Sequence, residues 1–319
     1  MVAYTIRRIL WFFPVLWAVA TITFFLMHAV PGGPFTQDKA RPPAVQQALD
    51  EKYNLNDPLW RQYSAFMLNA MKGDLGISTR TNDKPVTEVI RRTFFVTAQL
   101  GVLAFIVASV VGLTLGTLSA LNHNGPVDYL GVGFATVGAA VPNFILGSFL
   151  VIFFAIQLPW FKISGWGGPL EWSQVFDPAA YDWRKVVLPV VTLSVLPAAF
   201  LARVTRASVL EVLSQDYVRT ARSKGLASRS VVLGHVMKNS MIPVLTLMGP
   251  TFAALVSGSF IVETMFSIGG LGSESIKSIT QRDYGMIMGT TLFFAALVVT
   301  VNLIVDLLYA VVDPRIRYS

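Results

Sequence analysis

The sequence has no cysteine and only three histidines, and these absences narrow the chemistry that is open to it. Without cysteine there is neither a disulfide framework nor a thiolate for metal or redox chemistry. His28, His123 and His235 are scattered and lack the His-Glu-x-x-His spacing of a zinc protease, so we expect no metal site. The Gly-x-x-x-x-Gly-Lys-Ser/Thr phosphate loop and the Gly-x-Ser-x-Gly nucleophile turn are also missing. We therefore expect no catalytic residues, no bound cofactor and no ATP hydrolysis by this chain.

Charged residues are scarce. Asp, Glu, Lys and Arg make up 13% of the sequence against 54% hydrophobic residues, and the mean hydropathy is +0.58. Such a balance is typical of multi-spanning membrane proteins. Since about 20 apolar residues in a helix cross the hydrocarbon core of a bilayer, the sequence predicts an all-α polytopic protein with six transmembrane helices in a single domain, 1–319. The candidate spans are 9–30, 96–120, 130–156, 187–209, 241–265 and 286–312.

The placement of Lys and Arg predicts which loops face the cytoplasm. An even number of spans puts both termini on one side, and basic residues at both ends of the chain favour the cytoplasmic side. The connection between the fourth and fifth spans agrees, because its basic residues far outnumber Glu211 and Asp216. These basic residues are Arg203, Arg206, Arg219, Arg222, Lys224, Arg229 and Lys238. We interpret the net charge of +7 as a record of topology and of contact with anionic lipid, not of nucleic-acid binding.

Two longer loops are expected outside the membrane. The segment 31–92 is predicted to be an extracytoplasmic insertion, because its basic residues are matched by acids. Within it, Asn56-Asp57-Pro58 supplies a helix start and Gly73 a stop, so we expect a short helix whose apolar stripe packs on the outer helix ends or lies on the bilayer. The second loop, 158–185, is rich in tryptophan. We interpret its tryptophans as interfacial anchors, with the lining of a substrate entrance as the alternative.

The segment 210–240 combines basic residues with the signals of short helices. Ser214 can cap a helix, and Asp216 suits its acidic first turn. Gly225 is placed to end this helix in a left-handed conformation, so Gly225→Val should strain the backbone. A second helix is expected to begin at Ser228. This order predicts a short, capped helix on the cytoplasmic side.

The predicted helix has two different sides. Tyr217, Val218 and Ala221 share the apolar side, whereas Arg219 and Arg222 project from the polar side. We interpret the apolar side as a docking face for a partner, so that Ala221→Asp would place a charge in the interface. The alternative is an ordinary positive-inside loop that contacts lipid headgroups.

An ordered set of short sequence motifs resembles the motifs of one family of membrane proteins. The motifs are Arg7-Arg8 with Pro31-Gly32, Leu55-Asn56-Asp57-Pro58-Leu59, Gly73-Asp74-Leu75-Gly76-Ile77-Ser78, Asp216-Tyr217-Val218-Arg219-Thr220-Ala221-Arg222-Ser223-Lys224-Gly225 followed by His235, Asn239 and Pro243, Phe260-Ile261-Val262-Glu263-Thr264, Gly269-Gly270-Leu271-Gly272, and Asp313-Pro314-Arg315-Ile316-Arg317. Over nearly the whole chain they resemble the first permease subunit of the ABC importers of dipeptides and oligopeptides. The wider importer pattern has Glu-Ala-Ala before a glycine, whereas this chain has Arg219-Thr220-Ala221 before Gly225, as the peptide-type subgroup does. No role is carried over from the missing glutamate.

The resemblance implies a type I ABC importer permease fold in the cell membrane. It implies a heterodimer with a second homologous permease, two ATPase subunits that hold ATP and Mg, and an external binding protein that delivers peptides. Permeases of the same family also transport glutathione, nickel complexes and some sugars, so these substrates remain alternatives. It also implies coupling to the ATPase through the short cytoplasmic helix. The coupling residues would be Asp216, Tyr217, Arg219, Thr220, Ala221, Arg222, Lys224 and Gly225.

Prolines and acids inside the predicted spans indicate where a pathway could run. A proline that interrupts a helix frees carbonyl groups, which need protein or water around them at membrane depth. Glu263 and Asp306 are costly to bury in a bilayer. For Glu263 a structural pairing is favoured over a substrate contact, and for Asp306 a pair with a cytoplasmic arginine. The pathway candidates are Pro142, Asn143, Pro197, Pro250 and Glu263, on the third, fourth and fifth spans.

Two other functions are alternatives to that of an importer subunit. A secondary transporter or channel that works alone predicts inverted repeats and paired intramembrane charges, and the sequence displays no convincing repeat and few such acids. A membrane-anchored scaffold predicts that the outer insertion and the pathway prolines are dispensable. Gradient-driven uptake by the chain alone would favour the first of these.

Overall fold

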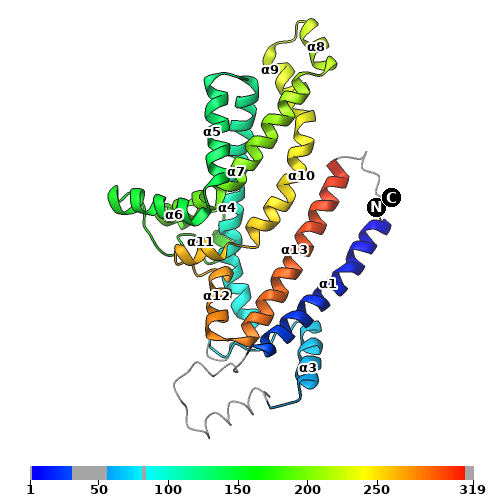
Figure 1. Cartoon of the computed structure of the whole chain (residues 1–319), viewed down its shortest axis with the longest axis vertical. Coiled ribbons are helices and arrows are strands. Elements are labelled where there is room, and N and C mark those ends of the chain that lie inside the picture. Colours follow the sequence, from blue (N-terminus) through cyan, green and yellow to red (C-terminus); the bar gives the residue numbers. More distant parts are fainter. Residues whose placement is uncertain (1, 31–55, 81–83, 313–319) are drawn as a thin grey trace. The chain divides into compact units, whose positions relative to one another are not determined.

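The computed structural model describes residues 2–30, 56–80 and 84–312, which form helices and connecting loops (Figure 1). Side chains are described throughout these ranges except in 2–5 and 306–312. Within them, an isolated bridge between Ile77 and Pro85 is the only β-type pairing. The predicted all-α fold is confirmed.

Five described helices are long and apolar enough to cross a membrane, and a bent pair raises the number to six. The five are Ile6–Ala29, Val86–Leu121, Trp183–Leu213, Ser228–Met265 and Tyr284–Val305. The bent pair consists of Pro126–Ala140 and Asn143–Gln157. Each of the six predicted spans therefore overlaps one of these segments, although the third and fifth are not continuous helices.

The chain divides into two compact units. The first comprises 1–96 and 269–300, and the second comprises 97–268 and 301–319. The boundaries fall inside α4 (Val86–Leu121) and α13 (Tyr284–Val312), so both long helices contribute to both units.

The first unit contains α1 (Val2–Ala29), α3 (Leu59–Met71), α12 (Leu271–Gln281) and the adjoining parts of α4 and α13. Its buried core consists of Val86, Ile90, Leu271 and Met286, surrounded by Leu75, Val89, Phe94, Phe293 and Phe294. The α3 helix rests on α1, where the hydroxyl groups of Tyr63 and Thr21 lie 2.8 Å apart. This short helix thus packs on a neighbouring helix, one of the two arrangements predicted for it.

The ends of α3 differ slightly from the sequence prediction. The helix begins at Leu59, so that Pro58 is its N-cap and not its first helical residue, and no side chain caps it. Pro58 has no N–H and therefore leaves no donor unpaired there. Gly73 follows the helix with φ of 81°, which confirms it as a left-handed stop.

One carboxylate holds the loop before α4 onto α13. Asp283 is almost completely buried. Its oxygens accept hydrogen bonds from the Ser78 hydroxyl (2.5 Å) and from the backbone N–H groups of Thr79 (3.3 Å), Arg80 (3.3 Å) and Met286 (3.2 Å). Because Asp283 also precedes the first turn of α13, one side chain both caps this helix and binds the loop.

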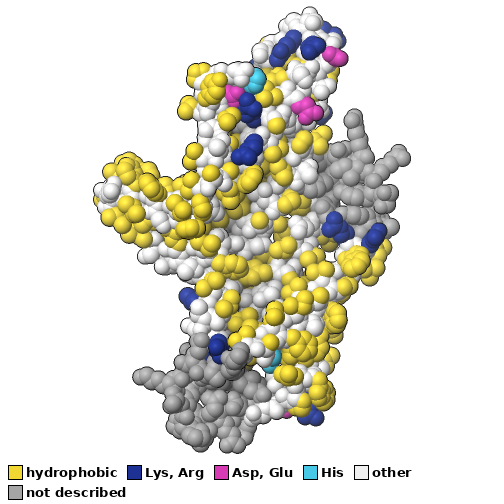
Figure 2. Space-filling view, in the orientation of Figure 1, with side chains coloured by type: hydrophobic (Ala, Val, Ile, Leu, Met, Phe, Trp, Pro, Cys, Tyr) yellow, Lys and Arg dark blue, Asp and Glu magenta, His cyan; other side chains and the backbone are white. Residues whose placement is uncertain are grey.

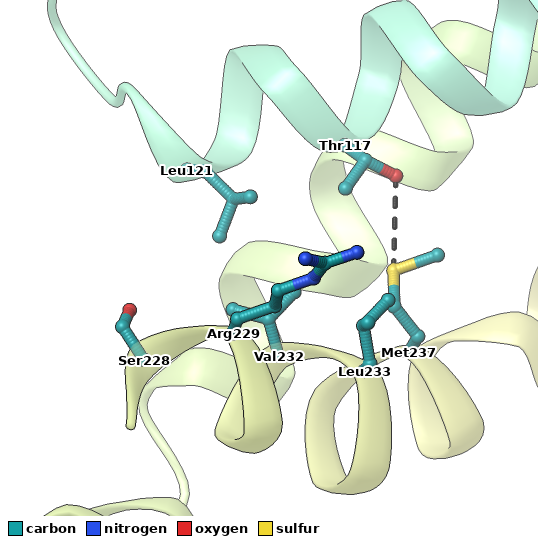
Figure 3. A pocket seen from close by; sticks show the side chains of 7 residues that line it. All are labelled: Thr117, Leu121, Ser228, Arg229, Val232, Leu233 and Met237. Carbon is teal, nitrogen blue, oxygen red and sulfur yellow. Dashed lines mark hydrogen bonds between the residues drawn. The ribbon is translucent and has the colours of Figure 1, made fainter.

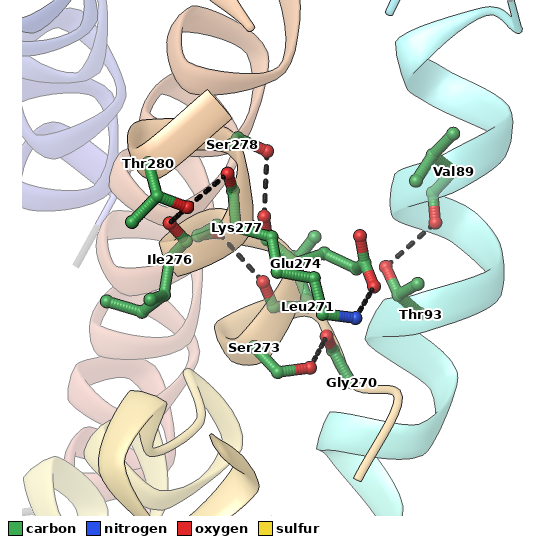
Figure 4. A network of polar contacts seen from close by, with 11 residues as sticks. Val89, Thr93, Gly270, Leu271, Ser273, Glu274, Ile276, Lys277, Ser278 and Thr280 are labelled. Carbon is green, nitrogen blue, oxygen red and sulfur yellow. Dashed lines mark hydrogen bonds and ion pairs between the residues drawn. The ribbon is translucent and has the colours of Figure 1, made fainter. Parts of the chain in front are cut away.

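The α12 helix buries a row of serines (Figure 4). The hydroxyl groups of Ser273, Ser275 and Ser278 donate to backbone carbonyls one turn earlier, at 2.7 to 2.9 Å. These bonds give each buried hydroxyl a partner within the helix itself, so the small side chains can face the core. Beside them, the partly buried Glu274 pairs with the exposed Lys277.

The second unit is built around α7 (Trp183–Leu213), which is packed by its neighbours along most of its length. These neighbours are α5 (Pro126–Ala140), α6 (Asn143–Leu150), α10 (Met237–Val256) and α11 (Phe260–Met265). The α4 helix also lies against α7. A Cβ at Gly112 would come within 2.6 Å of Leu201, and one at Gly116 within 2.5 Å of the Ala202 carbonyl oxygen. These two glycines, four residues apart, let α4 approach α7 closely.

The connecting segments of this unit are short helices. They are η1 (Val151–Gln157), which continues α6 as a π-helix, η2 (Trp172–Gln174), η3 (Pro178–Ala180), α8 (Asp216–Ser223), α9 (Ser228–Val231) and the π-helix η4 (Val232–Val236). From Ser228, the helical path through α9 and η4 runs on into α10.

The third predicted span, 130–156, is broken at its middle. Val141 is extended, with φ of −87° and ψ of 119°, and α6 turns away from α5 by 108°. The cause is Pro142, since a residue before proline is pushed out of the helical region. The interruption expected at Pro142 is therefore confirmed, and the third predicted span is a bent pair of helices.

We expect Asp283→Ala to destabilise the first unit, because four donors lose a shared buried acceptor. The loss should be about 2 kcal/mol of unfolding free energy, measured as a lower Tm of the detergent-solubilised protein. Proteolysis should then cut first in the loop before α4. Asp74→Ala, which removes a carboxylate bonded only to the nearby Gly76 N–H, is the matched control. An unchanged Tm in Asp283→Ala would contradict this role.

Candidate functional site

The segment predicted to couple to an ATPase forms α8. The helix starts one residue later than expected. Ser214 ends α7, donating its hydroxyl to the Glu211 carbonyl at 2.7 Å, and Gln215 is the N-cap of α8. The predicted capping by Ser214 is wrong, because its hydroxyl is engaged one turn back. At the other end Gly225 has φ of 79°, which confirms the left-handed stop.

The apolar side of α8 faces the protein itself. Val218 and Ala221 are buried, with exposed fractions of 0% and 6%. They join a cluster with Ala120 of α4, Val209 of α7, Val231 of α9 and Val236 of η4. The predicted placement of Ala221 on a docking face is therefore wrong: an amphipathic pattern shows which side is apolar, but not which surface that side meets.

The opposite side of α8 is exposed and basic. It presents the remaining predicted coupling residues, and Figure 2 shows Lys and Arg gathered over the region of α8 and α9. These residues are Asp216, Tyr217, Arg219, Thr220, Arg222, Lys224 and Gly225. Tyr217 is 42% exposed, so its predicted place on the apolar side is wrong. The Asp216–Arg219 ion pair spans 3.6 Å between side chains that are mostly exposed, so it contributes little to stability. The side-chain amide of Asn239 in α10 donates to the Tyr217 hydroxyl at 2.8 Å, which places the tyrosine ring beside α10.

A buried ion pair joins α5 to α7, and the sequence analysis did not single it out. Arg206 donates from Nε and Nη2 to the two oxygens of the Asp128 carboxylate, at 2.6 and 2.7 Å. The same carboxylate accepts the Asn124 N–H at 2.9 Å, which ties the turn before α5 to the helix. The only signal in the sequence was an acid early in one span and a base in another, and a separation of 78 residues hides the pairing.

Two pathway candidates, Pro142 and Asn143, lie at the break between α5 and α6. The Asn143 side-chain oxygen is buried without a hydrogen-bond partner among the described residues. The following helix is tightly packed, since a Cβ at Gly147 would come within 2.9 Å of Met265 Sδ in α11. The break therefore sits beside α7 and α11.

Pro197 and Pro250 lie inside α7 and α10, which pack against each other. Pro197 is half-buried and Pro250 is exposed. The five pathway candidates thus lie on α7 or on elements that pack against it. Their role in a pathway stays a prediction.

Glu263 lies at a break in the fifth predicted span. The α10 helix ends at Val256, Gly258 has φ of 91°, and α11 begins at Phe260. Glu263 is completely buried, and its Oε1 accepts a hydrogen bond from Thr97 Oγ1 at 3.0 Å. A Cβ at Gly258 would come within 2.5 Å of Thr97 and 2.8 Å of Glu263 Oε1, so only glycine fits. Glu263 therefore ties the helix break to α4 and faces no open space in this structure.

The loop 158–185 contains the tryptophans expected at the interface. Trp160, Trp172 and Trp183 are exposed, whereas Trp166 is half-buried. Close by, Lys162 Nζ donates to Asp182 at 2.8 Å, and this bond holds the pKa of the Asp182 carboxyl below its ordinary value. The described residues contain no group of three or more His, Asp or Glu side chains that could hold a metal. The side chain of Asp306 lies outside the described residues.

Comparison with known proteins gives one consistent picture. Residues 112–318 match the family model described as binding-protein-dependent transport system inner membrane component. The chain is 38% identical over 318 residues to the oligopeptide transport system permease protein OppB of Haemophilus influenzae, covering the whole of both chains. It is 37% identical over 317 residues to the dipeptide transport system permease protein DppB of Bacillus subtilis, covering 99% of this chain and 98% of the relative.

Solved structures resemble the fold at lower sequence identity. A chain of the MetNI methionine ABC transporter in an inward-facing conformation superposes with a TM-score of 0.56 and 16% identity, over 71% of this chain and 97% of that one. A chain of an amino acid ABC transporter has a TM-score of 0.52 and 17% identity, over 70% and 94%. These likenesses support the predicted type I importer permease fold.

We expect Ala221→Asp to destabilise the second unit, because it buries an unpaired carboxylate among valines. The cost should be about 3 kcal/mol or more, seen as a large drop in Tm and a loss of monodisperse protein. Ser223→Asp places the same charge on the exposed side of α8 and should cost only a few tenths of a kcal/mol. Equal Tm values for the two variants would contradict the burial of Ala221.

We also expect Asp128→Ala to cost roughly 3 kcal/mol, because it leaves the Arg206 charge unpaired. This is the lower end for buried pairs, since 27% of the Arg206 side chain is exposed. The double variant Asp128→Ala with Arg206→Met should recover part of this loss. Chemical denaturation in detergent measures all three variants. Additive losses in the double variant would show that the two residues do not interact.

Proposed function

Because the chain belongs to the family of binding-protein-dependent transport system inner membrane components, we propose that it conducts di- or oligopeptides into the cell. It is a transport component and not an enzyme. In this proposal, a second homologous permease completes the pathway, two ATPase subunits bind ATP and Mg, and an external binding protein delivers the peptide. Full-length similarity to permeases named for oligopeptide and dipeptide transport supports this substrate class.

The observation that carries the coupling role is the division of α8 into two sides. Its buried side, Val218 and Ala221, is packed against residues of α4, α7, α9 and η4. Its exposed side offers Arg219 and Arg222 to a partner. A helix fixed in this way cannot shift without pushing on the spans behind it. An ATPase that binds α8 differently in its open and closed states would therefore bias the permease between inward-open and outward-open arrangements.

Topology follows from the same assignment. An ATPase works in the cytoplasm, so α8 and both chain termini lie on that side, and the insertion 31–92 lies outside. The excess of Lys and Arg in the connection between α7 and α10 supports this orientation. Multi-pass insertion in the inner membrane agrees with the family and with the apolar helices.

The test is ATP-driven peptide uptake by the complete transporter in vesicles. Arg219→Glu with Arg222→Glu should reverse the charge of the exposed side of α8 and leave its packing intact. We expect normal Tm, at least a tenfold loss of uptake, and loss of the ATPase subunits on co-purification. Lys72→Glu, an exposed charge reversal after α3, is the control and should retain the ATPases.

Two results would overturn the proposal. One is normal ATPase association and uptake in the double variant. The other is uptake of peptide by this chain alone, driven by an ion gradient without any ATPase, which would favour a secondary transporter.

A further inference from the structure

A groove lies beside the coupling helix, at the end of α4 (Figure 3). Its accessible volume is about 410 Å³. It is lined by Thr117 and Leu121 of α4, Ser228 and Arg229 of α9, Val232 and Leu233 of η4, and Met237 of α10. None of these residues belongs to the predicted coupling or pathway sets.

Arg229 supplies the only formal charge of this lining. Its side chain reaches from α9 toward α4, between Leu121 and Thr117 (Figure 3). Among the described residues, no carboxylate pairs with it, in contrast to Arg206 and Arg219. A guanidinium held over apolar walls favours an anionic ligand, and phosphate oxygens match its donors.

The apolar walls belong to membrane spans. Thr117 and Leu121 form the last turn of one candidate span, and Leu233 and Met237 lie in the first turns of another, which begins at Ser228. Leu121 and Leu233 are exposed by 41% and 60%. Arg229 therefore lies near the ends of two helices that are long and apolar enough to cross a membrane, and the leucines continue from it along these helices.

The helix that borders the groove after α9 is irregular. Residues Val232–Val236 form a π-helix, whose extra residue per turn widens the backbone and displaces neighbouring side chains. Met237 closes the groove, its Sδ accepting the Thr117 hydroxyl at 3.8 Å. A widened turn beside a helix end leaves room for a chain-like apolar group under a polar head.

We propose that this groove binds an anionic phospholipid of the adjoining leaflet. Arg229 pairs with the phosphate, and an acyl chain lies along Leu233 and Leu121. The order of charge and apolar surface matches that of a lipid, with the head at the span ends and the tail toward the membrane interior. A protein partner docked here would have to cover leucines that belong to membrane-crossing helices.

The bound lipid would link α4 to the helices that follow α8. Both sides of the groove adjoin the buried cluster that holds α8, through Ala120 on one side and Val231 and Val236 on the other. The lipid would therefore stiffen the base of the coupling helix. This part rests on the proposed coupling function, whereas lipid binding itself does not.

Native mass spectrometry of the complete transporter in detergent tests the binding. Phosphatidylglycerol is titrated, with phosphatidylcholine as the neutral lipid. Arg229→Gln should weaken phosphatidylglycerol binding roughly fivefold, the effect of one basic residue at an anionic surface. Lys238→Gln removes the same charge from an exposed position nearby that does not line the groove, and should bind like the unmodified chain.

A second variant keeps the test decisive if Arg229→Gln does not assemble. Leu233→Trp fills the groove from an exposed position and should also lower phosphatidylglycerol binding without changing Tm. In vesicles, uptake by the unmodified transporter should rise with phosphatidylglycerol content, and uptake by Arg229→Gln should not. A loss of uptake with intact lipid binding would instead concern the coupling role.

Three outcomes would overturn the proposal. Phosphatidylglycerol could bind equally to Arg229→Gln and Leu233→Trp. Inorganic phosphate could displace the lipid completely, which would make the groove a simple anion site. The lipid could bind only after the ATPase subunits are removed, which would make the groove a protein interface.

Discussion

The structure depends on how α8 is held. Val218 and Ala221 are buried among residues of α4, α7, α9 and η4, so one short helix joins several long ones. Burial of a valine side chain contributes about 1.5 to 3 kcal/mol, whereas the exposed Asp216–Arg219 pair contributes at most about 1 kcal/mol. The apolar side therefore fixes the position of α8, and the charged side is left free for recognition.

Packing against the rest of the chain also fixes the backbone at the two helix breaks. At Pro142 and at Gly258 the backbone leaves the helical path, and at each break the chain returns against α7. The Gly258 break is closed by Glu263 and Thr97, which leaves no room for a side chain on the glycine. A buried acid in a span thus supports the backbone here. Intramembrane charge alone does not distinguish that use from substrate contact.

The sequence predicted the helices better than the contacts between them. Long apolar runs and the prolines within them are local signals, so the spans, the interruption at Pro142 and the stops at Gly73 and Gly225 could be predicted. The Arg206–Asp128 and Ser78–Asp283 pairings could not, because they join residues 78 and 205 positions apart. The face of Ala221 was missed for a related reason. Helical periodicity identifies an apolar side, but only the tertiary fold decides whether it meets the chain itself or a partner.

The basic residues between α7 and α10 show why this distinction matters. Counted together they form one positive-inside signal, yet the structure puts them in three different environments. Arg206 is paired with a buried carboxylate, Arg219 and Arg222 stand exposed on α8, and Arg229, also exposed, lines an apolar groove. The first charge contributes to packing, whereas in our proposals the second set meets a soluble partner and the last meets a lipid. A single count of charge therefore combines residues with different neighbours, and only the structure separates them.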